Sequence, residues 1–175
     1  PRRSDRGWRF SPAVGFGATI SSEGVSVLTS FGAALVYGHS GLGWWLGASL
    51  SGAQEEPLGA GVVRYSRWPA MTGPLFRLGT APLRAEFVAG GAVAWLSIEG
   101  EGFPRDRSTN DLTWGPFASS RLFLTELASP LHPFVGATGV WWAKEAVAYV
   151  DSLGEDTVTL SPLEFWITAG ISVDL

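Results

Sequence analysis

The sequence predicts an all-β fold: an eight-stranded antiparallel up-and-down transmembrane barrel, formed as a single domain over residues 1–175. Three observations predict it. Large apolar residues alternate with Gly, Ser or Thr for ten or more positions at a time, which is the period of a β-strand. Only 16% of the residues are charged, against about 25% in soluble domains. No run of about 18 apolar residues is present to form a membrane-spanning helix, so the hydrophobicity must be distributed over strands.

The first three predicted strands cover residues 8–21, 25–37 and 42–51, separated by turn-like segments at 22–24 and 38–41. In each strand one face has large apolar residues and the other has small or polar ones. The two faces of the second strand differ less in residue size and polarity than those of the other two. The apolar face of the first strand consists of Trp8, Phe10, Pro12, Val14, Phe16, Ala18 and Ile20.

A loop at residues 54–57 precedes a long fourth strand that extends to about Thr80. Pro69 and Pro74 interrupt it, and because proline lacks the N–H group that a paired strand needs, the register of this strand stays open. After a turn at 81–83 the fifth strand again separates two faces. Its larger residues are Ala85, Phe87, Ala89, Val93 and Trp95, opposite Arg84, Glu86, Gly90 and Ala92.

Residues 99–111, EGEGFPRDRSTND, form the longest polar stretch of the chain. Polar residues with Gly and Pro are typical of an exposed loop, so we expect a loop here. It is the favoured place for contact with a protein partner, through Phe103, Arg105, Asp106 and Arg107.

The last three predicted strands cover about 114–127, 134–149 and 163–175. A tight turn at 129–133 is expected to open the seventh strand and to contain His132, and residues 151–156 form the next loop. The eighth strand alternates most clearly: Leu163, Phe165, Ile167, Ala169, Ile171, Val173 and Leu175 lie opposite Glu164, Trp166, Thr168, Gly170, Ser172 and Asp174.

The direction of the two faces decides between a soluble and a membrane barrel. With the large residues inside, as in a lipocalin, Trp, Phe and Leu from every strand would crowd a narrow interior and almost no charge would face water. With the large residues outside, strands of about 9 to 11 spanning residues face lipid and small residues fill the interior. Five tryptophans then lie near strand ends or on the outward face, as an aromatic girdle requires: Trp8, Trp44, Trp68, Trp95 and Trp141.

Over its whole length the chain resembles the small eight-stranded outer-membrane barrels of Gram-negative bacteria, similar to the OmpA transmembrane domain and OmpX. The resemblance is carried by the architecture and by the terminal strand EFWITAGISVDL. The chain departs from these proteins in ending on Leu175, where they commonly end on an aromatic residue that is recognised during barrel assembly.

The resemblance implies a location in the bacterial outer membrane, contact with membrane lipid and lipopolysaccharide, and insertion by the barrel-assembly machinery. Both termini and the turns near His39, Pro82 and Pro130 are then expected on the periplasmic side. Loops near Glu23, Glu55, Arg105 and Gly154 are expected outside. The expected role is non-enzymatic: anchoring, envelope structure, or adhesion and partner recognition through the outer loops.

The inward face collects charges of both signs: Arg77, Arg84, Glu86, Arg121, Glu164 and Asp174. Because an unpaired buried charge costs several kcal/mol, we expect these groups to pair as a polar plug of the lumen. A gated ion path is the alternative. A constitutive pore is not expected, because eight strands enclose little room for water.

Several function classes are disfavoured by composition. A net charge of -4 with a single lysine, Lys144, argues against nucleic-acid binding. With no Cys, two His and no acidic cluster at calcium-loop spacing, no metal site and no cofactor is expected.

Two alternatives stay open: a soluble lipocalin-like barrel that binds an apolar ligand, and an enzyme that modifies lipid A. Some small outer-membrane barrels that the chain resembles in outline modify lipid A with a Ser, a His and an acidic residue. Here His39 and Ser40 are neighbours and would point to opposite faces of a strand, which disfavours a base and nucleophile pair.

Overall fold

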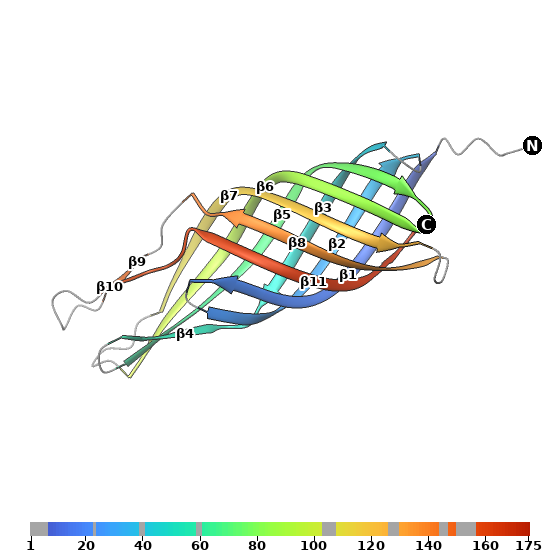
Figure 1. The fold of residues 1–175 in the computed structure, drawn as a ribbon. Coiled ribbons are helices and arrows are strands. Elements are labelled where there is room, and N and C mark those ends of the chain that lie inside the picture. Colours follow the sequence, from blue (N-terminus) through green and yellow to red (C-terminus); the bar gives the residue numbers. More distant parts are fainter. Residues whose placement is uncertain are drawn as a thin grey trace, which may run out of the picture.

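The computed structural model describes residues 7–22, 24–38, 41–58, 61–102, 108–125, 130–143, 147–149 and 157–175. Over these residues eight strands close an antiparallel barrel (Figure 1). They are β1 (Trp8–Ser21), β2 (Gly24–Tyr37), β3 (Gly41–Ser51), β5 (Gly61–Thr80), β6 (Leu83–Glu101), β7 (Ser108–Leu124), β8 (Leu131–Trp141) and β11 (Leu163–Val173). No helix in these ranges is long and apolar enough to cross a membrane.

Each barrel strand pairs with the next barrel strand along the chain, and the pairing of the first strand with the last closes the ring. β1 pairs with β11, with Ala13 opposite Ser172, and β3 pairs with β5, with Gly41 opposite Arg77. Three short strands lie outside the ring: β4 (Gln54–Leu58) pairs with β5, and β9 (Val147–Tyr149) pairs with β10 (Thr157–Thr159). The predicted fold class is confirmed.

The direction of the faces is also confirmed. Most large apolar residues of β1, β2, β3 and β11 point outward and are exposed, while the positions that alternate with them on the inside are mainly Gly, Ser, Thr and Ala. The large inward exceptions are Leu28, Val36, Trp45 and Trp166. The five predicted girdle residues all point outward, and Trp114 joins them. This arrangement places the apolar surface of the molecule on the outside of the barrel.

Three strands are far longer than a membrane requires. β5, β6 and β7 have 20, 19 and 17 residues, whereas about 9 to 11 residues cross a bilayer. Figure 1 shows the ends of these strands projecting with β4 beyond the barrel, opposite the end that carries the C-terminus. We call residues 54–58, 61–67, 96–101 and 108–111 the projecting sheet, and the opposite end, where Leu175 exchanges backbone hydrogen bonds with Phe10, the terminal end.

The expectation of a loop over residues 99–111 is corrected by the strands of the projecting sheet. β6 continues to Glu101 and β7 begins at Ser108, with Glu99 opposite Ser108, so the described residues at both ends of this stretch are in strands. Polar residues are compatible with strands here because Glu99, Glu101 and residues 108–110 are exposed to water. The expected contact residues Phe103, Arg105, Asp106 and Arg107 lie outside the described residues, as does His39.

The seventh predicted strand also needs correction at both ends. β8 begins at Leu131, so His132 belongs to a strand and its side chain is buried, whereas a surface turn was expected. β8 ends at Trp141, and Tyr149 belongs to the separate strand β9. The prolines at 130 and 133 favoured a turn in the sequence. In the structure Pro133 occupies a paired position of β8 opposite Ile171.

Candidate functional site

The inward-facing side chains form two charged clusters at different heights, separated by aromatic side chains and a small cavity. The larger cluster lies toward the terminal end and is called the Glu86 cluster. It contains Arg77, Arg84, Glu86, Arg121 and Asp174, with Ser11 and His132 at its margin. Five of the six charged residues predicted for the lumen therefore come together.

Strand register explains the centre of this cluster. Arg77 of β5 is paired with Glu86 of β6, and Glu86 is paired with Arg121 of β7, so a carboxylate stands between two guanidinium groups in one row across three strands. Glu86 is only 1% exposed. Arg77 donates through Nε to Glu86 Oε1 at 2.9 Å, and Arg121 Nη2 lies 2.9 Å from Oε2.

Arg84 connects Glu86 with the carboxylate of Asp174, next to the C-terminal residue. Arg84 Nη1 donates to Asp174 Oδ2 at 2.6 Å, while its Nε lies 3.7 Å from Glu86 Oε1. Its guanidinium also lies over the ring of Phe123, 4.6 Å from the centroid. The end of β11 is thereby tied to β6 through the interior.

Asp174 also contacts a serine and the buried histidine. Ser11 Oγ donates to Asp174 Oδ1 at 2.7 Å, and His132 Nε2 lies 3.4 Å from Oδ2. The serine hydroxyl thus bonds the carboxylate and not the imidazole. This order of contacts does not form a nucleophile with its general base, which requires a hydrogen bond between serine and histidine.

Glu164, the sixth predicted residue, lies apart from the Glu86 cluster. It forms an ion pair with Arg67 of β5, and both side chains are buried. Arg67 also donates through Nη1 to the carbonyl of Ser161 at 3.3 Å and lies over the ring of Trp142. Arg67 was missed because the register of this strand was open, although it shares odd parity with the inward Arg77.

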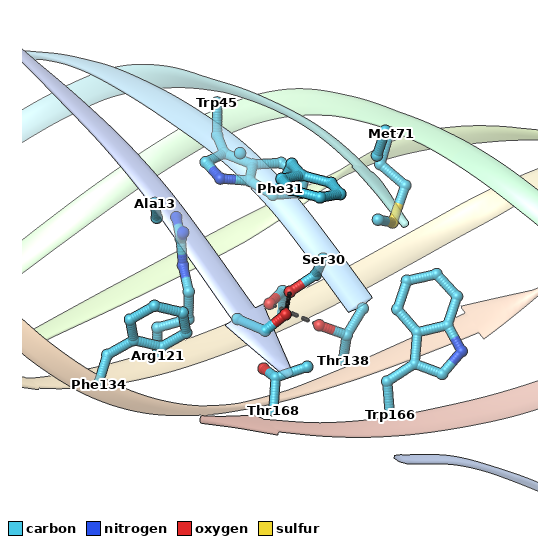
Figure 2. A pocket seen from close by; sticks show the side chains of 14 residues that line it. Ala13, Ser30, Phe31, Trp45, Met71, Arg121, Phe134, Thr138, Trp166 and Thr168 are labelled. Atoms are coloured by element: carbon cyan, nitrogen blue, oxygen red, sulfur yellow. Dashed lines mark hydrogen bonds between the residues drawn. The ribbon is translucent and has the colours of Figure 1, made fainter. Parts of the chain in front are cut away.

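Between the two clusters the interior is filled by apolar side chains, which include the aromatic rings of Trp45, Phe117 and Trp166. The ring of Trp45 occupies space that Gly32 and Gly47 leave free, because a Cβ at Gly47 would lie 2.3 Å from that ring. Beside it is a cavity of about 40 Å³, shown in Figure 2. Arg121, Ser119, Thr138 and Trp166 are among its lining residues, and Thr138 Oγ1 donates to Ser119 Oγ at 2.8 Å.

The projecting sheet carries charge on its outward face. Arg64 Nη2 lies 2.6 Å from Glu55 and 3.9 Å from Glu101, and Glu99 is opposite Arg64 in the strand register. The hydrogen bond and the charge of Glu55 raise the pKa of the exposed Arg64 guanidinium above its ordinary value. Three carboxylates therefore surround one cation.

No group of three His, Cys, Asp or Glu side chains within the described ranges could hold a metal ion. The charged groups of the interior are instead engaged with oppositely charged side chains.

Comparison with known proteins identifies the fold. No family model matches the chain, and no curated protein matches its sequence. Among solved structures, a major outer membrane protein from Thermus thermophilus superposes with a TM-score of 0.67 at 13% identity, covering 96% of this chain and 99% of that one.

Two other structures are similar at lower scores. The N-terminal β-barrel domain of Pseudomonas aeruginosa OprF gives a TM-score of 0.55 at 10% identity, covering 94% of this chain and 97% of that one. Ail, the attachment invasion locus protein of Yersinia pestis, gives 0.53 at 8%, also covering 94% and 97%. The chain therefore has the fold of the small eight-stranded β-barrels of bacterial outer membranes.

Proposed function

We propose that the chain is an integral barrel of a bacterial outer membrane that presents the projecting sheet to a partner outside the cell. The uncharged outward band carries this proposal. On β5 the outward positions from Trp68 to Leu78, and on β6 those from Ala85 to Trp95, include no Asp, Glu, Lys or Arg. Each stretch matches the about 9 to 11 residues that cross a bilayer, and tryptophan stands at the projecting end of both.

The Glu86 cluster supports a structural role for the interior. Its carboxylates connect side chains of β5, β6, β7 and β11, so the correct register of four strands brings their charges together. A register shift by one residue would turn each of these groups toward lipid. We assign the cluster to holding the barrel closed and in register.

The projecting sheet supports partner recognition, and its charge indicates the kind of partner. Ail was solved with the heparin analogue sucrose octasulfate. On this chain the described outward face has Glu55, Glu99 and Glu101 around Arg64, which favours a cationic partner over a sulfated polysaccharide. Lipid, lipopolysaccharide and the barrel-assembly machinery complete the proposed set of partners.

The alternatives receive less support. A lipocalin-like function needs space for an apolar ligand, and a cavity of about 40 Å³ is far smaller than the roughly 300 Å³ of a small-ligand site. A lipid A-modifying enzyme needs its base on the lipid-facing wall, whereas His132 points inward to Asp174.

Cysteine labelling tests the location and orientation, since the chain has no natural cysteine. Asn110→Cys places a thiol on the projecting sheet and Pro130→Cys places one at the terminal end, both exposed. In intact Gram-negative cells a membrane-impermeant maleimide should label the first and not the second. Permeabilised outer membranes should allow both. Labelling of Pro130→Cys alone in intact cells would mean that the barrel has the opposite orientation. Equal labelling of both variants would contradict insertion into the membrane.

Binding of a fluorescent oligolysine peptide to the purified barrel in zwitterionic detergent tests the partner chemistry. The double variant Glu99→Gln/Glu101→Gln should bind the peptide more weakly than the original chain does. Labelled heparin should not bind the original chain. The reverse preference, for heparin over oligolysine, would overturn the assignment of a cationic partner.

A further inference from the structure

The cavity beside Trp45 is lined by N–H groups that lack an acceptor. The indole Nε1 of Trp45 and the Nε of Arg121 are both buried and make no hydrogen bond within the described part of the chain. Both side chains line the cavity and both are at least nine-tenths buried, with 8% exposure for Trp45 and 9% for the side chain of Arg121. A buried donor without an acceptor costs about 1–3 kcal/mol, so each group favours an acceptor in the cavity.

The two side chains that carry these donors are in contact. The guanidinium carbon of Arg121 is 5.2 Å from the centroid of a Trp45 ring. Figure 2 shows both side chains on one side of the cavity and Trp166 on the other. The Ser119 and Thr138 hydroxyls add a third donor, because the single hydrogen bond between them uses one of their two protons and leaves the other for a ligand in the cavity.

The charge of the neighbouring Glu86 cluster has the sign that an anion needs. Within the described residues the cluster contains three arginines and two carboxylates. Arg77 donates through Nε to Glu86 and also has its Nη2 2.7 Å from Glu86 Oε1, and Arg84 donates to Asp174. Among these same residues Arg121 has one ionic contact, and its Nη2 forms no hydrogen bond of good geometry. Arg121 is therefore the guanidinium of the cluster with the least compensation, and it is the one that reaches the cavity.

We propose that the barrel interior binds one small monovalent anion of the halide class in this cavity, against Arg121 and Trp45. Water would satisfy a donor, but it would leave the excess positive charge of the cluster uncompensated. An anion satisfies the donors and the charge together. The volume of about 40 Å³, where about 10–15 Å³ is enough to admit one water, has room for a ligand of water-like size and limits the anion to a small one.

Crystals of the chain refolded in bromide provide the direct test. We expect an anomalous bromide peak within hydrogen-bonding distance of Trp45 Nε1 and the Arg121 guanidinium. A cavity that contains only water gives no such peak, and that result would overturn the proposal.

A stability measurement provides the second test and isolates the N–H group. At constant ionic strength the thermal midpoint of the folded band on an unboiled gel should be higher in chloride than in gluconate, which is too large for the cavity. Trp45→Phe keeps an aromatic ring, removes the donor and should abolish this difference. Trp142→Phe also removes a buried unpaired indole N–H, but one outside the cavity, and should preserve it. An equal chloride effect in both variants would contradict the assigned site.

Discussion

Replacement of Glu86 by glutamine tests the Glu86 cluster at its centre. The side chain keeps its shape and loses its charge. In the native barrel the carboxylate lies 2.7 Å from Arg77, 2.9 Å from Arg121 and 3.7 Å from Arg84. The variant leaves Asp174 as the remaining carboxylate of the cluster, facing three guanidinium groups.

The expected loss of stability follows from the burial of these groups. Removal of one partner from a buried ion pair costs about 3–5 kcal/mol, because the other charge stays behind without compensation. Glu86 is 1% exposed and contacts two arginines within 3 Å, so we expect the upper half of this range, about 4–5 kcal/mol. This corresponds to a roughly thousandfold change in the folding equilibrium constant.

Unfolding in urea from lipid vesicles, followed by tryptophan fluorescence and by the folded band on an unboiled gel, measures this loss. Glu99→Gln is the matched control on the projecting sheet and should change stability by no more than about 0.5 kcal/mol. Adding Arg121→Gln to Glu86→Gln should restore part of the loss, because it removes one uncompensated cation. A Glu86→Gln barrel as stable as the original would refute the account of the interior as a network of mutually dependent charges.

Three further predictions test other parts of the structure by the same unfolding assay. Ile167→Arg puts a charge on the lipid face near the middle of β11 and should cost about 2–4 kcal/mol; no loss would argue that this face does not meet lipid. Gly47→Leu should cost about 1–3 kcal/mol because its Cβ would overlap an indole ring, whereas Gly91→Leu, with nothing within 4 Å, should be tolerated; equal effects would contradict the interior packing. Arg84→Ala should cost about 3 kcal/mol by removing the cation bonded to Asp174, and an unchanged midpoint would exclude that pair as a stabilising contact.

The fold was predictable because the lipid and the narrow interior impose opposite demands on alternate residues. Leu163, Phe165 and Ile167 must face hydrocarbon, while Gly170 must face the crowded inside, where its Cβ would lie 2.1 Å from the carbonyl oxygen of Val14. Alternation of this kind appears in the sequence directly. It also predicted the inward direction of the charged residues, since no unpaired charge is tolerated in hydrocarbon.

The ends of the strands were less predictable because the alternation stops carrying information where the lipid ends. Ser108 and Asn110 continue β7 into water, where a polar residue on either face costs nothing, so strand and loop look alike in the sequence. Inside the barrel, partner choice depends on register across strands that are distant in the sequence. Glu164 forms its ion pair with Arg67 and does not join the Glu86 cluster because of the register of β5. This register could not be predicted from the sequence, since Pro69 and Pro74 interrupt the strand.

Electrophoresis of the purified chain, unboiled and boiled, with and without detergent, tests most directly whether the outward band faces lipid. We predict that the chain needs detergent to stay dispersed, and that the unboiled sample migrates as a compact species that boiling converts to a slower one. A monomer that is soluble in buffer alone would contradict the membrane barrel.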